Sequence, residues 1–459
     1  MNQSIAEQIA GFTVRLDAGQ IPDSVFEAVK LHILDTAGVA ILSSRTAPTS
    51  EYMRRMVTSA DSTPECTLWG STDRVQLTDA VLCNGTVIHG LDFDDTHTGA
   101  ITHPSASILP VAFAVGEKLR KSGLEIMTAA VAGYEVIVRL GLAANGGFHD
   151  AGFHPSGILA PFAGVCVAGK LMGCDEKTIT NALGIAGSQA GTIMEFLHDG
   201  SLVKMLHPGW GALSSIYALR CAQSGFTGPK TVFEGQYGVF PIHIGDCRDL
   251  EERIATLGSQ WLTPDIAFKL YPTCHHTHSF IDILNRLMEE HQFGAEDIEA
   301  IEARGTAMCA SQVCNPKEVK VRPETEYMMK FSLYYVLAMT ALHRKITAEE
   351  INLEYAKDPR VLALIDRITF ITDNTIAVPG HMPGRLKVTL KDGRVLTGRQ
   401  DYEKCARENP IRPEDVIRKY EGCVDGILSR DNRIALQEMC LNFDHLNNVY
   451  AFLTAMADI

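Results

Sequence analysis

The sequence predicts a mainly α-helical protein with a smaller α+β domain. Residues 76–225 are rich in Ala, Gly, Leu and Val and show little of the apolar–polar alternation that is typical of strands. Runs of β-forming residues begin only after Pro264, and the C-terminal tail returns to helical spacing. At 459 residues the chain is also too long for one simple core. We therefore expect a helical domain made of residues 1–265 and 404–459, and an α+β domain over residues 266–403.

Three segments predict long helices in the first domain. Residues 22–43 start near Pro22 and carry apolar residues at helical spacing. Residues 124–144 and 178–197 are rich in small side chains, which favours helices packed closely together. The tail contains two further helical patterns, PEDVIRKYEG and RIALQEMCLNF, and we expect it to pack on the first domain.

The α+β domain is predicted from strand patterns that alternate with helical ones. Residues 384–399, GRLKVTLKDGRVLTGR, are two β-rich runs joined around Asp392-Gly393, which predicts a hairpin. The other expected elements are strands at 298–306 and 367–372 and helices at 279–292 and 325–342.

Composition and charge narrow the classes of partner. The formal net charge of −14 argues against nucleic acid and anionic membranes, and an anionic ligand must be held by local positive groups. The N-terminal residues lack the basic and apolar regions of an export signal, so we expect a cytoplasmic protein. Twelve cysteines without a C-x-x-C pair indicate reduced thiols and make a structural zinc site improbable.

Histidines concentrate in one part of the chain, with eleven of the sixteen between His89 and His278. The richest window is HGLDFDDTHTGAITHPS, residues 89–105. If the helix before it continued, Asp92 and Thr96 would extend one stripe of that helix, as a pocket wall would. His103 follows a glycine-containing turn and could return towards Asp92. The alternative is that the aspartates of this window are solvated and its histidines are incidental.

Other windows carry weaker signals. His154 precedes a proline and is compatible with an ordinary turn residue. Lys204 lies among apolar residues, where a lysine either snorkels to water or serves a site. The cluster of Cys274, His275, His276 and His278 resembles a metal site, but neighbouring ligands cannot easily converge on one ion, so we expect no metal.

Familiar cofactor and nucleophile motifs are missing from the sequence. No phosphate loop, no G-x-G-x-x-G after a strand and no G-x-S-x-G elbow is found. What remains is acid–base chemistry without a cofactor, carried by Asp, His and Lys and acting on a small anion.

The segment NGTVIHGLDFDDTHTGAITHPS (84–105) closely resembles the signature of the MmgE/PrpD family, and the similarity extends over essentially the whole chain. That family includes 2-methylcitrate dehydratase, cis-aconitate decarboxylase and iminodisuccinate epimerase. The resemblance implies a large helical domain built from both chain ends, an α+β lid, a homodimer and no cofactor or metal. It also continues through four further motifs: GFHPSGILAPFAG (152–164), LVKMLHPGWGA (202–212), FKLYPTCHHTHSFID (268–282) and KFSLYYVLAMTAL (330–342).

Carried over residue by residue, the resemblance implies catalytic roles for Asp92, His103, His154 and Lys204. It implies substrate binding by Thr96, Lys269, Cys274 and His275. Cys274 stands where some members have a histidine, which leaves the second proton donor open. A tyrosine used by some members has no secure counterpart among Tyr327, Tyr334 and Tyr335.

The family's reactions make or quench a carbanion beside a carboxylate or imine, so cations must bind carboxylates while an acid or base moves a proton. Lys204 and Lys269 suit carboxylate binding, His103 suits the acid–base role with Asp92 orienting it, and His154 would act at the opposite side. We expect a lyase, either a dehydratase or a decarboxylase, acting on a small di- or tricarboxylate. The alternatives are an epimerase of the iminodisuccinate type and a catalytically inactive carboxylate-binding protein.

Overall fold

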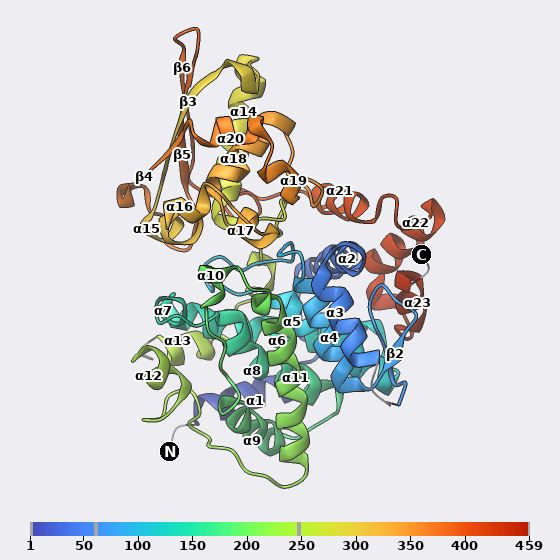
Figure 1. The fold of residues 1–459 in the computed structure, drawn as a ribbon. Coiled ribbons are helices and arrows are strands. Elements are labelled where there is room, and N and C mark those ends of the chain that lie inside the picture. The colour runs from blue at the N-terminus through green and yellow to red at the C-terminus, as the bar shows by residue number, and fades with distance from the viewer. Residues whose placement is uncertain (1–2, 59–62, 246–248, 458–459) are drawn as a thin grey trace. The chain divides into compact units, whose positions relative to one another are not determined.

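The computed structural model describes residues 3–58, 63–245 and 249–457. The chain forms two compact units, and the first contains both chain ends, as the fold class predicted (Figure 1). The first unit is Met1–Glu195, Val203–Phe268 and Arg412–Ile459, and the second is Phe196–Leu202 and Lys269–Ile411.

The first unit is built almost entirely of helices, with one short antiparallel pair, β1 (Cys66–Thr67) and β2 (Arg74–Val75). Its helices are α1 (Ile5–Arg15), α2 (Asp23–Thr46), α3 (Pro48–Thr58), α4 (Leu77–His89), α5 (Pro104–Leu119), α6 (Gly123–Ala144), α7 (Gly147–Asp150), α8 (Pro155–Leu171), α9 (Glu176–Gly187), α11 (Val203–Gln223), α12 (Val239–Ile244), α13 (Leu250–Ala255), α21 (Pro413–Val424), α22 (Arg430–Leu441) and α23 (Tyr450–Ala457).

Helices α8 and α11 lie at the centre of this unit, and α11 packs on α4, α5, α8 and α9. Helices α4 and α11 approach each other closely, because a Cβ on Gly85 would lie 2.5 Å from the Cα of Gly209. A side chain at either position would clash with the opposite helix, so glycine is required at this contact. Because of this crossing, the first turn of α11 lies beside the C-terminal end of α4.

The C-terminal tail is attached to the first unit through a buried ion pair. The Nζ of Lys419 in α21 lies 2.6 Å from Oδ1 of Asp35 in α2, and both side chains are almost fully buried. Lys419 also donates a hydrogen bond of 2.7 Å to the carbonyl of Phe93 and lies 4.0 Å from the centroid of that ring. Burial raises the pKa of Asp35 to about 6, while the Lys419 ammonium opposes the shift.

Among the described residues, one helix, α6, is long and apolar enough to cross a membrane. Of its most apolar window, 94% is buried inside the protein. It therefore has the burial expected of a core helix, and it packs on α8 and α5.

The second unit contains a four-stranded mixed sheet of order β4-β3-β5-β6, in which only the β3–β4 pair is parallel. The predicted hairpin is present as β5 and β6. The strands are β3 (Ile298–Gly305), β4 (Ile368–Thr372), β5 (Gly384–Leu390) and β6 (Val395–Gln400). The helices are α10 (Phe196–Asp199), α14 (His278–His291), α15 (Ala307–Cys309), α16 (Lys317–Lys320), α17 (Glu326–Lys330), α18 (Leu333–His343), α19 (Leu353–Ala356) and α20 (Pro359–Ile365).

Two expected helices are shorter than the sequence predicts. The helix expected over 178–197 ends at Gly187, and Gln189, Ala190 and Gly191 lie in the loop that follows it. The helix expected over 325–342 is broken into α17 and α18 at Phe331 and Ser332, where the Ser332 side chain caps α18 by accepting from the backbone N–H of Tyr335.

We predict that Lys419→Met lowers the free energy of unfolding by about 3 kcal/mol, because it leaves a buried carboxylate without its partner. Asp35 should then bind a proton more readily in the folded than in the unfolded protein. The loss should consequently be smaller at pH 5 than at pH 8. Urea unfolding at both pH values measures this.

The matched control for Lys419→Met is Arg418→Gln on the same helix. Arg418 pairs with Asp415 at the surface and its side chain is 68% exposed, so we expect a loss below about 1 kcal/mol. Equal effects of the two substitutions would contradict a structural role for the Lys419–Asp35 pair.

Candidate active site

The histidine-rich segment is a buried loop between α4 and α5. Asp92, Asp94 and Asp95 are all 0% exposed, so the alternative of solvated aspartates is wrong. The expectation that a helix continues through Asp92 and Thr96 is also wrong, because α4 ends at His89 and Asp92 has a left-handed backbone with φ of 53°. A non-glycine residue holds this conformation only where its surroundings fix it.

Asp95 holds the loop in place through its carboxylate. One of its carboxylate oxygens accepts from the backbone N–H of Ser105 at 3.0 Å, and the other accepts from the Ser105 hydroxyl and lies 2.9 Å from Nδ1 of His32. The Ser105 hydroxyl in turn lies 2.6 Å from that of Tyr134, whose pKa burial raises well above its usual value. Asp95 therefore has its oxygens occupied by the scaffold and serves to position the loop.

Asp94 binds the last residue of α4. Nδ1 of His89 lies 2.9 and 3.0 Å from the two carboxylate oxygens of Asp94, and both side chains are fully buried. A carboxylate accepts here, so Nδ1 of His89 carries the hydrogen. Nε2 of His89, on the other side of the ring, is buried without a hydrogen-bond partner among the described residues.

Asp92 forms an ion pair with the ammonium group of Lys204. Nζ of Lys204 lies 2.6 Å from Oδ2 of Asp92, and Lys204 is only 5% exposed. The snorkelling interpretation of Lys204 is therefore wrong, because its head group is inside the protein. Nε2 of His103 lies 3.8 Å from the other carboxylate oxygen, which is within reach of charge attraction and too long for a hydrogen bond.

The hydrogen bonds around His103 define which nitrogen faces Asp92 with a lone pair. Nδ1 of His103 lies 3.0 Å from the carbonyl oxygen of Asp95 and 3.3 Å from the hydroxyl of Thr96. A carbonyl can only accept, so Nδ1 donates and carries the hydrogen in the neutral ring. Nε2 is then the nitrogen that gains and loses a proton, which is the property required of an acid–base group.

His154 lies near His103 and His207. Its ring centroid is 6.2 Å from that of His103, and its Nδ1 is 3.1 Å from Nδ1 of His207. Burial, followed by the charge of Lys204, holds the pKa of His154 well below its usual value. Burial also lowers the pKa of His207 to about 4, so the pair is neutral near pH 7.

Three helices present their N-terminal ends to this cluster of Asp92, His103, His154 and Lys204. His103 and His154 are the N-cap residues of α5 and α8, each followed by a proline in the first turn, and Lys204 is in the first turn of α11. The two His-Pro loops are joined because the backbone N–H of His103 donates to the Ser156 hydroxyl at 3.0 Å. Helix N-termini carry partial positive charge, so the cluster favours an anion.

Thr96 lies beside the same cluster, with its hydroxyl 3.3 Å from Nδ1 of His103, and its backbone pairs with that of Ala267 through hydrogen bonds of 2.8 and 2.9 Å. The structure thus brings together five predicted site residues: Asp92, Thr96, His103, His154 and Lys204. It places the other three in the second unit. That they line the same pocket remains a prediction.

In the second unit, Lys269, Cys274 and His275 are all buried, with exposures of 2%, 8% and 3%. The backbone N–H of Cys274 donates to the carbonyl of Lys330, and the ring of His275 lies 4.5 Å from that of His278. Of the candidate tyrosines, Tyr335 donates its hydroxyl to the Glu350 carbonyl at 2.5 Å, which indicates a structural role.

Among the residues that the structure describes, two overlapping groups could hold a metal ion by their geometry. The donor atoms of His89, Asp92, Asp94 and His103 lie within 4.8 Å of one another, as do those of His89, His103 and His154. The ammonium group of Lys204 already lies 2.6 Å from Asp92, so a cation is in place beside this carboxylate. A divalent ion there would meet repulsion from Lys204.

Comparison with known families identifies the family of this chain. The MmgE/PrpD N-terminal domain matches residues 7–249, and the MmgE/PrpD C-terminal domain matches residues 271–443. The chain belongs to the MmgE/PrpD family. The resemblance stated from the sequence motifs is thereby confirmed.

Several members of the MmgE/PrpD family with assigned activities are similar to this chain. Cis-aconitate decarboxylase of Homo sapiens is 29% identical over 99% of this chain and 95% of its own length. Cis-aconitate decarboxylase of Aspergillus terreus is 26% identical over 98% of this chain and 95% of its own length. 2-Methylcitrate dehydratase of Escherichia coli is 21% identical over 71% of this chain and 69% of its own length. The relatives are thus decarboxylases and dehydratases of small carboxylic acids.

Sequence reasoning missed the residues that hold the site in place, namely His89, Asp94, Asp95, Ser105 and His207. One signal was present, because the tripeptide His-Pro-Ser occurs twice, at 103–105 and 154–156. In the structure both serines are fully buried, and each accepts or donates a hydrogen bond that ties a loop to its neighbours.

We predict that activity survives dialysis against EDTA, because the lysine ammonium next to Asp92 opposes a resident divalent ion. Metal analysis of the purified protein by mass spectrometry should find less than about 0.1 equivalent of zinc or iron. Activity lost on chelation and restored by either metal would show that the His89–His103 group is a metal centre.

Proposed function

We propose that this protein is a lyase that removes CO₂ from a small unsaturated tricarboxylate of the cis-aconitate class. The observation that carries the proposal is the buried Lys204–Asp92 pair beside His103, at the N-terminal ends of three helices. Supporting it, the cis-aconitate decarboxylases match nearly the whole chain, whereas the 2-methylcitrate dehydratases match 68–71% of it.

The electrostatics of the site suit a multiply charged anion. The protein carries a formal charge of −14, which repels such a substrate at long range. Lys204 and the three helix N-termini offset this repulsion locally, and burial strengthens each interaction because water is excluded. In this account Lys204 binds one substrate carboxylate as a point charge and Thr96 donates a hydrogen bond to it.

The reaction needs one proton and no cofactor. The bond from carbon to the departing carboxylate breaks, and its electron pair forms a new carbon–carbon double bond. The electrons of the original double bond then take a proton at the far carbon, so that the trianion and one proton give a dianion and CO₂. In our proposal Nε2 of His103 delivers this proton, while the Asp95 carbonyl holds the ring by Nδ1 and Asp92 favours the protonated form.

His154 has a different role because its lowered pKa keeps it neutral. A neutral imidazole is a poor acid, but it can donate a hydrogen bond to a carboxylate without titrating near pH 7. In this proposal His103 transfers the proton, and His154 orients the substrate through a hydrogen bond to a carboxylate.

Proton NMR in deuterated buffer tests the activity directly, with cis-aconitate, 2-methylcitrate and iminodisuccinate as separate substrates. We expect release of CO₂ from cis-aconitate with one deuterium in the product. Loss of water from 2-methylcitrate alone would make the protein a dehydratase. Racemisation of iminodisuccinate with deuterium exchange would make it an epimerase, and no turnover of any of the three would contradict the proposal.

We predict that His103→Gln folds normally and loses at least about 100-fold in kcat, the usual contribution of a general acid. Its unfolding midpoint should stay close to that of the wild type. The control is His149→Gln on α7, for which we expect unchanged kcat. If His103→Gln keeps near-normal turnover, His103 is a structural residue.

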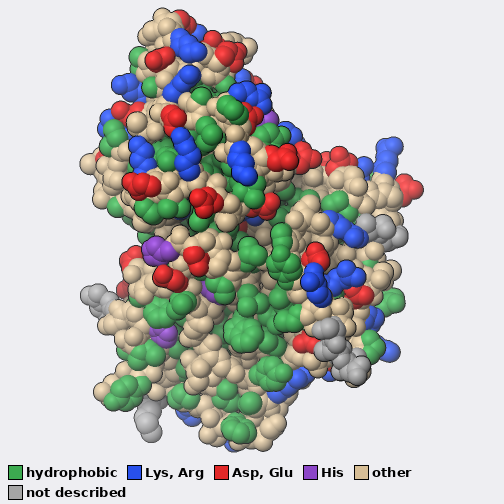
Figure 2. Space-filling view, viewed as in Figure 1, with side chains coloured by type: hydrophobic (Ala, Val, Ile, Leu, Met, Phe, Trp, Pro, Cys, Tyr) green, Lys and Arg blue, Asp and Glu red, His purple; other side chains and the backbone are tan. Residues whose placement is uncertain are grey.

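We also propose that two copies of the chain associate through the outer face of α11. Val203, Trp210 and Tyr217 are 43%, 48% and 47% exposed and recur every seven residues, with Leu206 and Leu213 between them. Figure 2 shows hydrophobic side chains gathered over this helix. A contiguous apolar stripe of this kind is typical of a protein–protein interface.

We predict that the wild type is a dimer by light scattering at micromolar concentration and that Trp210→Glu is a monomer, because a charge would then be buried in the interface. Tyr237→Glu is the control, since Tyr237 is 83% exposed outside this stripe. A monomeric wild type, or dissociation by both substitutions alike, would contradict the assignment of this interface.

A further inference from the structure

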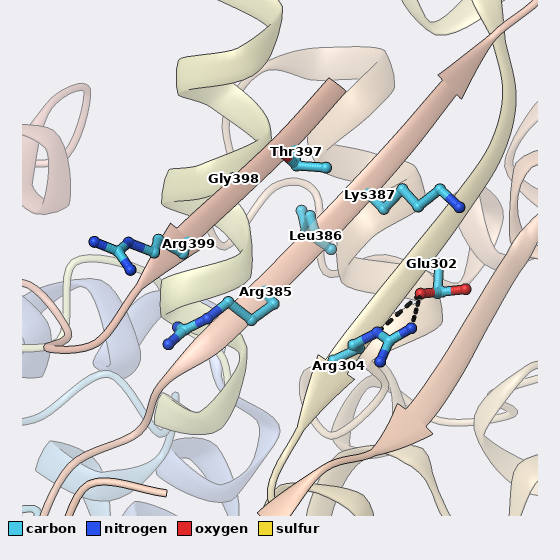
Figure 3. A pocket seen from close by; sticks show the side chains of 8 residues that line it. All are labelled: Glu302, Arg304, Arg385, Leu386, Lys387, Thr397, Gly398 and Arg399. Carbon is cyan, nitrogen blue, oxygen red and sulfur yellow. Dashed lines mark hydrogen bonds and ion pairs between the residues drawn. The ribbon is translucent and has the colours of Figure 1, made fainter. Parts of the chain in front are cut away.

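One face of the sheet in the second unit carries a group of basic side chains. On β5, Leu386 and Val388 are buried on the side that packs against α14, and Arg385 and Lys387 project from the opposite side. On β6, a Cβ at Gly398 would collide with Ile283 of α14, so the flanking Arg399 lies on the face away from the helix. Figure 3 shows these side chains along the strands.

Three arginines stand side by side across three strands. Arg304 of β3 pairs in register with Arg385 of β5, and Arg385 pairs with Arg399 of β6. Neighbouring strands are about 4.8 Å apart, so the three Cα atoms form a row about 10 Å long. Like charges directly opposite each other destabilise a sheet, so folding alone does not favour this row.

The acidic residues nearby neutralise only part of this charge. Arg304 is held by Glu302 at 2.8 Å, and Arg385 is held by Asp401. Within the described parts of the chain, Lys387 and Arg399 are exposed and form no ion pair, although Glu302, which binds Arg304, lies opposite Lys387 in the strand register. Two positive charges thus remain on a protein whose net charge is −14.

The same residues line a hollow in the surface. Its volume is about 510 Å³, within the range of small-molecule sites. The hollow is lined by Glu302, Arg304, Arg385, Leu386, Lys387, Thr397, Gly398 and Arg399 (Figure 3). It shares no residue with the Asp92 cluster in the first unit.

We propose that this hollow binds a small polyanion with at least two phosphate or carboxylate groups. The planar guanidinium of arginine matches both groups through paired hydrogen bonds, and Lys387 adds a point charge one row away. A ligand with a single anionic group would meet one or two arginines only, whereas a polyanion can span the row. Bound anions would also remove the repulsion among Arg304, Arg385 and Arg399, so binding and stability are coupled.

The test uses calorimetry on the full-length protein at low ionic strength, with tripolyphosphate, citrate and inorganic phosphate as separate probes. We expect tripolyphosphate to bind at one site per chain, at least about tenfold more tightly than inorganic phosphate. Citrate belongs to the substrate class proposed for the Asp92 cluster, so only the citrate binding that Arg399→Gln removes is assigned to the hollow. The tighter of tripolyphosphate and citrate at the hollow assigns the ligand to phosphates or to carboxylates. Arg399→Gln and Lys387→Gln should each weaken that binding at least about tenfold.

Lys391→Gln is the matched control, because Lys391 is an exposed cation on the same hairpin but outside the hollow. It should leave the affinity unchanged. The melting temperature gives a second readout, since tripolyphosphate should raise it in the wild type and in Lys391→Gln but not in Arg399→Gln. The absence of binding, or equal weakening by Lys391→Gln and Arg399→Gln, would overturn the proposal.

Discussion

The ion pair between Lys204 and Asp92 is the interaction on which the candidate site depends. Both groups are almost fully buried, and two buried charges lose more free energy of hydration than an isolated pair usually recovers. The surrounding structure offsets this cost. The glycine contact between α4 and α11 brings the first turn of α11 to the end of α4, and the left-handed backbone of Asp92 turns its carboxylate towards Lys204. The pair therefore indicates a site shaped for charge, in a unit that is otherwise an apolar helical core.

The loop that carries Asp92 is fixed by local contacts to His89 and Ser105 and by contacts to His32 and Lys419, which are distant in the sequence. Asp95 binds Ser105 and lies beside His32, Asp94 binds His89, and Lys419 binds the carbonyl of Phe93. Each aspartate of the loop thus has its own partner, and only Asp92 is paired with a lysine at the N-terminus of a helix. This division of roles explains why three neighbouring aspartates are buried together. Two of them secure the loop, and we assign the third to chemistry.

Local patterns were sufficient to predict the helices at 22–43, 124–144 and 279–292, the hairpin and the participation of both chain ends in the helical unit, but not the ends of the helices expected over 178–197 and 325–342. They failed where distant residues decide the backbone, as at Asp92, where a helical stripe was expected and a buried loop was found. The anchor between Lys419 and Phe93 joins residues 326 positions apart, and no spacing rule indicates it. The roles assigned to Asp92, His103, His154 and Lys204 came from resemblance. The structure adds which atoms of these residues meet, and it leaves Lys269, Cys274 and His275 as predictions in the other unit.

The central claim, that the Lys204–Asp92 pair is needed for turnover and adds little net stability to the fold, is tested most directly by a double-mutant cycle. Lys204→Met, Asp92→Asn and the double variant would each be measured for the free energy of unfolding and for kcat on the substrate found by NMR. Lys204→Met alone should lower the free energy of unfolding by about 3 kcal/mol, because it leaves the buried carboxylate of Asp92 without its partner. The double variant should recover most of this loss. Turnover should stay at least about 100-fold below wild type in all three. Recovery of turnover together with stability in the double variant would contradict the account.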